Sequence, residues 1–181
     1  MSSGVYISTH SGNSFYFDEP NPEAIDLEDI CHALSNMCRF TGHTKSFYSV
    51  AQHSVIVANL CGDWSHQVQK QALLHDATEA YLSDINTPAK SLLKDYQELE
   101  HKVWQAICKR FDMQEQLYPQ VKRADRVAVM LEKRNLLKVE SDWGPEYESV
   151  DTSYLEMPTP LYPQEAKALM LNRCRELGLI N

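Results

Sequence analysis

From residue 26 onward, apolar residues recur at intervals of three and four, the spacing that places them on one face of an α-helix. This periodicity predicts helices over about residues 26–37, 49–60, 65–81, 91–111, 119–136 and 163–177. Short polar side chains and prolines are favoured at helix starts, and the residues that fill this role are Asp26, Ser49, Ser65, Pro119 and Pro163. The chain is therefore expected to be all-α over most of its length.

Two segments depart from the helical pattern. Val5–Ile7 and Phe15–Phe17 flank a Ser-Gly-Asn turn, which predicts a short β-hairpin. Residues 142–162 are polar and rich in proline, so we expect an extended connection there. With 181 residues and 43% apolar content, the chain can build one hydrophobic core. We expect a single domain over residues 1–181, in which a C-terminal extension, residues 142–181, packs on a helical bundle.

Composition excludes two broad classes of function. The formal net charge is −8, whereas a general nucleic-acid binder needs a basic surface to neutralise phosphates. No apolar run approaches the ~18 residues that a membrane span requires. We therefore expect no nucleic-acid partner and no membrane. A phosphorylated substrate would need a local group of basic residues, or a metal ion, to overcome the acidic charge.

The cysteines and the N-terminal residues bear on the compartment. The five cysteines are odd in number and form no C-x-x-C pair, which is typical of reduced thiols that pack as small hydrophobes. Residues 1–20 lack the basic segment and the apolar stretch of a secretory signal. These observations favour a cytoplasmic protein with no disulfide framework.

Ionisable residues interrupt the apolar stretches at a few positions. His75 and Asp76 follow an apolar segment of the predicted helix 65–81, and Glu79 lies one helical turn later. Burying an unpaired charge is costly, so these groups need partners. They can form a hydrogen-bonded structural group, or they can hold a metal ion together. The same two interpretations apply to His53 and Asp125, which lie within other predicted helices.

In chain order these residues form the pattern H…HD…D, made of His53, His75-Asp76 and Asp125. That order resembles the signature of the HD-domain phosphohydrolases. Further matching segments extend the resemblance over about residues 11–126, and they are Ile25–Ile30, His32–Asn36, Cys38–Phe40, Gly42-His43, Tyr48–Ser54, Leu74–Tyr81, Asp84 and Thr87–Lys90. Among HD domains, the chain is similar to small 5′-deoxynucleotidases of the YfbR type and to compact phage dATP triphosphohydrolases of the DatZ type.

The resemblance implies an HD-domain helical bundle and one metal ion held by His53, His75, Asp76 and Asp125. Two imidazoles and two carboxylates suit Co²⁺, Mn²⁺, Ni²⁺, Zn²⁺ or Fe²⁺ better than Mg²⁺, which favours oxygen ligands. By motif position, Glu79 is the acid/base residue and Asp84 also serves the active site. The same resemblance leads us to expect a homo-oligomer.

Residues that would bind a nucleotide substrate are also suggested. Arg39 matches an arginine that contacts the 5′-phosphate in the deoxynucleotidases, and its planar fork suits phosphate oxygens. Phe40 stands where those enzymes carry a tryptophan, so it keeps an apolar wall without the indole N–H. Lys90 and Lys122 are candidates for contacts with further phosphates, and His43 for the lining of the pocket.

The sequence leaves several functions open. The leading one is hydrolysis of the 5′-phosphate ester of a 2′-deoxynucleotide, either a dNTP (dATP favoured, with release of triphosphate) or a dNMP. A 5′-deoxynucleotidase restricted to monophosphates is one alternative, and a non-catalytic regulatory HD domain that binds a nucleotide is another. A helical scaffold in which the same residues are only buried ion pairs is the third. A cyclic-dinucleotide or cAMP phosphodiesterase also stays open within the family, although the sequence shows no second metal cluster of the kind that dinuclear members use.

Overall fold

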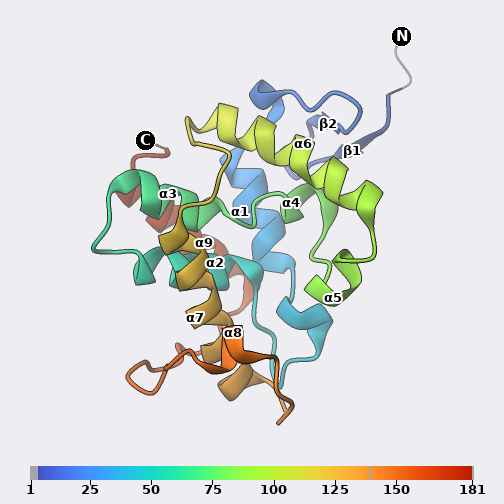
Figure 1. The fold of residues 1–181 in the computed structure, drawn as a ribbon. Coiled ribbons are helices and arrows are strands. Elements are labelled where there is room, and N and C mark those ends of the chain that lie inside the picture. The colour runs from blue at the N-terminus through green and yellow to red at the C-terminus, as the bar shows by residue number, and fades with distance from the viewer. Residues whose placement is uncertain (1–3, 139, 181) are drawn as a thin grey trace.

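The N-terminal segment forms the predicted hairpin. In the computed structural model, which describes residues 4–138 and 140–180, β1 (Tyr6–Ser8) pairs antiparallel with β2 (Ser14–Tyr16), as Figure 1 shows. Alternate strand residues face opposite sides, and Phe15 is the inward-facing residue of β2. Its ring is fully buried and stacks on Tyr81 at 4.1 Å between centroids, which attaches the hairpin to the helices.

The rest of the described chain is mostly helical, as the apolar periodicity predicts. Its helices are α1 (Leu27–Asn36), α2 (Val50–Leu60), α3 (His66–Leu74), α4 (Glu79–Leu82), α5 (Thr87–Lys90), α6 (Lys94–Arg110), α7 (Pro119–Leu136), α8 (Pro145–Glu148) and α9 (Pro163–Glu176), with 3₁₀ turns η1 (Pro22–Ala24) and η2 (Arg39–Gly42). The expected caps are confirmed, since the side chains of Asp26, Ser49 and Ser65 accept hydrogen bonds from first-turn amides of α1, α2 and α3.

Two expectations need correction. The helix predicted over residues 65–81 is not continuous: α3 ends at Leu74, and a turn over residues 75–78 separates it from α4. Hydrogen bonds to the third preceding residue, such as Glu79 N to Asp76 O (3.0 Å), tighten the chain there. The connection 142–162 is not wholly extended either, because it contains α8, which begins after Gly144 at a positive φ of 95°.

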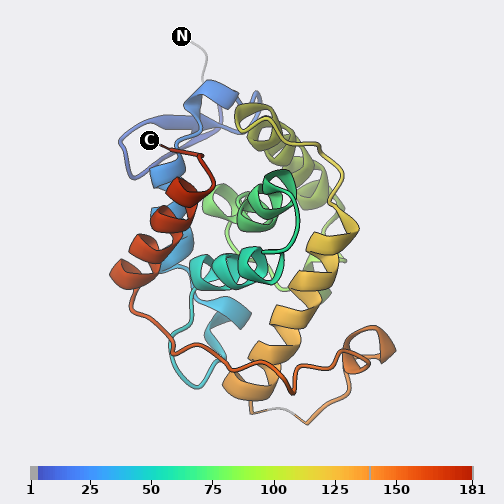
Figure 2. The same ribbon diagram turned by 90° about the vertical axis from the view of Figure 1, so that its left-hand side faces the viewer.

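Helix α2 lies at the centre of the bundle and contacts α1, α3, α7 and α9. In Figure 2, α1 and α9 lie on one side of α2, and α7 lies on the other. Every residue of α2 from Val50 to Ala58 is buried, so His53 in its middle has no access to solvent. Residues from Phe15 to Leu177 contribute to one hydrophobic core cluster, in which Ala166, Met170 and Cys174 of α9 take part.

Two sequence expectations concern whole-chain properties. In the described part of the chain, no helix combines the length and the apolar character that crossing a bilayer requires. All five cysteines are free, and four of them are buried. Cys31 of α1 and Cys174 of α9 lie close, with 3.9 Å between their sulfur atoms, and both pack inside the core.

Candidate metal centre

Three of the four predicted ligands meet at one point. His53 comes from α2, His75 from the C-terminal end of α3 and Asp125 from α7, and one ligand atom of each lies within 4.8 Å of the others. His53 is fully buried and the other two are partly buried. This cluster can hold a metal ion, because imidazole nitrogen and carboxylate oxygen are common ligands of divalent transition metals.

Asp76, the fourth predicted ligand, borders the same point. Its carboxylate oxygens lie 3.6 Å from Nε2 of His53 and 3.3 Å from Nε2 of His75. Asp125 Oδ1 lies 3.2 Å and 3.8 Å from the same two nitrogens. Donor atoms that share one ion at about 2.1 Å lie roughly 3.0–3.4 Å apart at octahedral or tetrahedral angles. The observed spacings are close to that range.

The two imidazole rings are oriented so that their Nε2 atoms face this point. Nδ1 of His75 lies 2.8 Å from the carbonyl oxygen of Ala72, which can only accept, so in the neutral ring Nδ1 carries the proton and Nε2 a lone pair. Nδ1 of His53 lies 2.7 Å from Oε1 of Glu132, a carboxylate that fixes this ring in the same way. Neither Nε2 atom has a hydrogen-bond partner within the described residues, although both are buried. Buried nitrogens of this kind normally have a partner, and a metal ion would supply one.

The carboxylates around the rings favour positive charge at this point. Burial and the Arg39 charge would lower the pKa of His53, but Glu132 and Asp125 together raise it to about 10. Burial would raise the pKa of Asp125, yet the two imidazoles hold it well below its ordinary value. Protons on the rings or a divalent cation can supply the charge that this field attracts.

Glu132 is a site residue that no motif predicted. It is fully buried on α7, seven residues after Asp125, so two turns of helix place both on the same face. Its second oxygen, Oε2, accepts a hydrogen bond from Nη2 of Arg39 at 3.2 Å. Burial would raise the pKa of Glu132, but the His53 and Arg39 charges lower it, so the group stays ionised. The sequence signal that could have identified Glu132 is its position among the apolar residues of this helix, where a charged side chain needs a partner.

Glu79 and Asp84 lie near the cluster on the α4 side. Glu79 is buried at the start of α4, and its Oε2 atom has no hydrogen-bond partner within the described residues. Burial, followed by the charges of Asp76 and Asp84, raises the pKa of Glu79 well above its ordinary value. Asp84 is partly buried, and burial is also the main cause of its raised pKa. Glu79 and Asp84 thus place two further carboxyl groups near Asp76.

Arg39 lies at the cluster, but its guanidinium is already engaged. It is buried, its Nε and Nη2 atoms donate to Glu132, and Nη1 lies 3.6 Å from Asp76. Burial opposes its charge, yet Glu132 and Asp76 outweigh that effect and raise the pKa of Arg39. Phe40 follows with a left-handed φ of 53°, and its ring lies 5.3 Å from the Arg39 guanidinium carbon. Contact of Arg39 with a phosphate stays a prediction.

The other predicted substrate-binding residues form no hydrogen bond or ion pair with the cluster among the described residues. Lys122 is exposed and lines a small cavity together with His75 and Asp125. Lys90 donates to Oε1 of Glu100 at 2.7 Å, which tethers its charge to α6. His43 is exposed after η2, and within the described residues its side chain has no hydrogen bond to the cluster.

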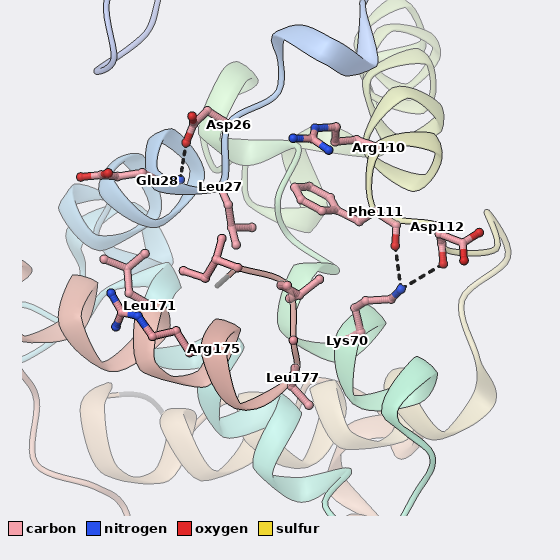
Figure 3. Close-up of a pocket in the computed structure, with 13 residues that line it drawn as sticks. Asp26, Leu27, Glu28, Lys70, Arg110, Phe111, Asp112, Leu171, Arg175 and Leu177 are labelled. Atoms are coloured by element: carbon pink, nitrogen blue, oxygen red, sulfur yellow. Dashed lines mark hydrogen bonds between the residues drawn. The ribbon is translucent and has the colours of Figure 1, made fainter.

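Two cavities differ in their relation to the cluster. The smaller, about 180 Å³, opens beside His75 and Asp125 and is also lined by Leu117, Val121, Lys122, Arg126, Glu146 and Tyr147. The larger, about 610 Å³, lies between α1, the end of α6 and the end of α9, and none of its lining residues belongs to the His53, His75, Asp76 and Asp125 cluster (Figure 3). Its Lys70 donates to the carbonyl oxygens of Phe111 and Asp112, so this cation already has partners.

Comparison with known proteins adds two relatives. The chain is 37% identical to the uncharacterized protein YfdR of Escherichia coli over 173 residues, which cover 96% of each chain. It is 36% identical over 125 residues to an uncharacterized protein of Rhodobacter capsulatus, covering 65% of this chain and 64% of that protein. No family model matches the chain. The similarity to YfdR over nearly the whole chain therefore shows a family relationship, and the name of that relative states no activity.

Proposed function

The chain belongs to the same family as YfdR of Escherichia coli, and we propose that it is a metal-dependent phosphohydrolase that cleaves the 5′-phosphate ester of 2′-deoxynucleotides. The observation that carries this proposal is the pair of buried Nε2 atoms, of His53 and His75, that face Asp125 and Asp76 and have no hydrogen-bond partner among the described residues. The order of these residues in the chain is that of an HD-domain phosphohydrolase.

The residues fit a divalent transition metal in charge and in chemistry. His53, His75, Asp76 and Asp125 would hold the ion, and Glu132 would keep the His53 ring in place through Nδ1. A carboxylate on the outer nitrogen of a ligating histidine is a frequent arrangement at such centres. When bound, the ion would polarise a phosphoryl oxygen and make water a stronger acid.

The chain's own residues supply proton transfer and orientation. Glu79 is buried beside Asp76, and its Oε2 has no hydrogen-bond partner in the part of the chain that the structure describes, so it can take a proton from attacking water or give one to the leaving oxygen. Arg39, held by Glu132, keeps a fixed positive charge at the cluster against which a phosphate can be oriented. Both roles match the motif positions of these residues in the family that the sequence resembles.

The number of phosphates on the substrate is the open part of the proposal. Lys122 and Arg126 line the small cavity beside His75 and Asp125, which supports a site that receives more than one phosphate. We therefore favour a dNTP, with dATP first, over a dNMP. Arg126 is paired with Glu146 at 2.6 Å, so Lys122 is the cation on which this preference depends more.

Product analysis tests the reaction directly. Purified protein is loaded with Co²⁺ or Mn²⁺ and incubated separately with dATP and dAMP, with Glu79→Gln as the matched variant. Deoxyadenosine plus intact triphosphate from dATP is the expected result, and Glu79→Gln should lose about 100-fold or more in rate. Orthophosphate from dAMP alone would replace the dNTP version by a 5′-deoxynucleotidase. Failure to bind a stoichiometric metal, together with no turnover, would remove the proposal and leave a helical scaffold.

A further inference from the structure

The connection between α7 and α9, for which no motif predicts a function, borders the cavity beside His75 and Asp125 through Glu146 and Tyr147. Residues on α7 that follow the cluster residues by one position hold this connection. Arg126, next to Asp125, pairs with Glu146, and Lys133, next to Glu132, pairs with Glu148. Because these two cations are seven residues apart, they form a stripe on α7 beside the stripe that faces the metal cluster.

Trp143 lies beside these ion pairs and contacts them. The ammonium of Lys133 lies 4.7 Å from the centre of the Trp143 ring, a cation–π contact. The backbone N–H of Trp143 donates to Oε1 of Glu148 at 3.1 Å, and Lys133 also donates to the carbonyl oxygen of Ser141. The backbone of Trp143 is thus tied to Glu148, and its indole lies against the Lys133 ammonium beside α7.

Three aromatic rings form a row at the edge of the cluster. The ring of Phe40 lies 6.2 Å from that of Trp143, which lies 6.3 Å from that of Tyr147. All three side chains are partly exposed. At one end Phe40 follows Arg39 and packs against it, and at the other end Tyr147 lines the small cavity with His75 and Asp125. The row therefore joins the arginine to the metal-binding residues.

We propose that Trp143 and Tyr147, together with Phe40, form the wall that binds the nucleobase of the substrate. This proposal rests on the proposed function, whose substrate carries a flat aromatic base attached to the phosphate that the metal cluster receives. Aromatic side chains stack on bases regardless of sequence, because every base has a π-face. The ion pairs Arg126–Glu146 and Lys133–Glu148 are positioning contacts that act through this wall.

Two ligands separate the wall from the metal cluster in a binding experiment. Deoxyadenosine monophosphate carries both base and phosphate, whereas deoxyribose 5-phosphate carries the same phosphate without a base. Affinity for each is measured by calorimetry on the metal-loaded protein, with Glu79→Gln used throughout to prevent turnover. Trp143→Ala and Tyr147→Ala should each lower the affinity for the nucleotide by roughly 10-fold or more. The affinity for deoxyribose 5-phosphate should change by no more than about 2-fold.

Matched variants guard against loss of structure. Tyr154 is 69% exposed and lies in the same connection, so Tyr154→Ala should change neither affinity. Trp143→Phe keeps a ring over Lys133 and should recover most of the nucleotide affinity that Trp143→Ala loses. If Trp143 served only to fold the connection, Trp143→Ala would weaken the binding of both ligands alike.

The outcomes distinguish the wall from the reaction. Wild-type affinity for the nucleotide in both alanine variants would overturn the wall, and so would an equal loss for both ligands. Hydrolysis that continues with unchanged KM in those variants would overturn the wall and leave the proposed function standing. Base-dependent binding without hydrolysis of any nucleotide would support the wall and overturn the proposed function.

Discussion

The larger cavity and the small cavity differ in how their polar atoms are satisfied. In the larger one, Lys70 donates to the carbonyl oxygens of Phe111 and Asp112 (Figure 3), and Arg110 donates to the carbonyl oxygen of Ile25. In the small one, His75 presents a buried nitrogen that has no hydrogen bond in the described chain. Volume alone would select the first cavity. Unsatisfied buried groups select the second, because such groups are costly unless a ligand completes them.

The largest effect should come from removing a ligand at the small cavity. His75→Ala deletes one of the two Nε2 atoms, and we expect stoichiometric metal to be lost and nucleotide hydrolysis to fall by roughly 1,000-fold or to background. Metal content by elemental analysis and turnover by chromatography measure the two effects. Full metal content and full activity in this variant would show that the active site does not lie at the small cavity.

A smaller loss of metal affinity is expected when the carboxylate behind His53 is changed. Glu132→Gln keeps the shape of the side chain but removes the charge that faces Nδ1 of His53. We expect metal affinity to fall by roughly 10- to 100-fold, as measured by titration against a competing chelator. Glu148→Gln also removes a carboxylate paired to α7, but one that faces Lys133, so it should leave metal affinity unchanged. Equal effects of the two variants would contradict a role for Glu132 at the histidine.

Metal removal should lower thermal stability by an intermediate amount. At a free metal concentration about 100 times the dissociation constant, binding contributes about 2.7 kcal/mol, which corresponds to roughly 5–10 °C in Tm for a domain of this size. Thermal unfolding with a chelator, and again after Co²⁺ is restored, measures the shift. His75→Ala serves as the control, since its Tm should not respond to Co²⁺. A shift that persists in this variant would place the stabilising ion elsewhere.

The smallest effect is expected at the larger cavity. Lys70→Met keeps the aliphatic stem but removes the donor that satisfies the carbonyl oxygens of Phe111 and Asp112. We expect a loss of about 1–2 kcal/mol in the free energy of unfolding, measured in urea, with no change in metal affinity. Loss of metal binding or activity in Lys70→Met would show that the larger cavity also contributes to the active site.

Much of the helical fold could be predicted, because apolar periodicity and caps act locally. Asp26, Ser49 and Ser65 cap the helices they were expected to cap. Periodicity also extended the third helix through His75, where the chain in fact tightens into a turn. Both conformations have similar backbone angles near that residue, so sequence pattern alone does not separate them.

The His53, His75 and Asp125 cluster that could hold a metal ion was predicted from a family resemblance, whereas its surroundings depend on tertiary contacts. His53, His75 and Asp125 lie far apart in the chain but match an ordered pattern. Glu132 carries no motif, although its spacing from Asp125 on a buried helix face was a usable signal. Trp143 and Tyr147 lie in a connection whose path over the surface no local rule specifies, so their approach to Phe40 could not be anticipated.

The helical spacing of α7 determines two sets of contacts at once. Asp125 and Glu132 face the histidines, and the residues that follow them hold the connection beyond. One residue inserted between positions 125 and 132 would rotate all later side chains by about 100°, since a helix has 3.6 residues per turn. The contact of Glu132 with His53 and the contact of Lys133 with Trp143 would then both be lost. We expect relatives of this chain to vary in the amino acids of this stretch while keeping its length.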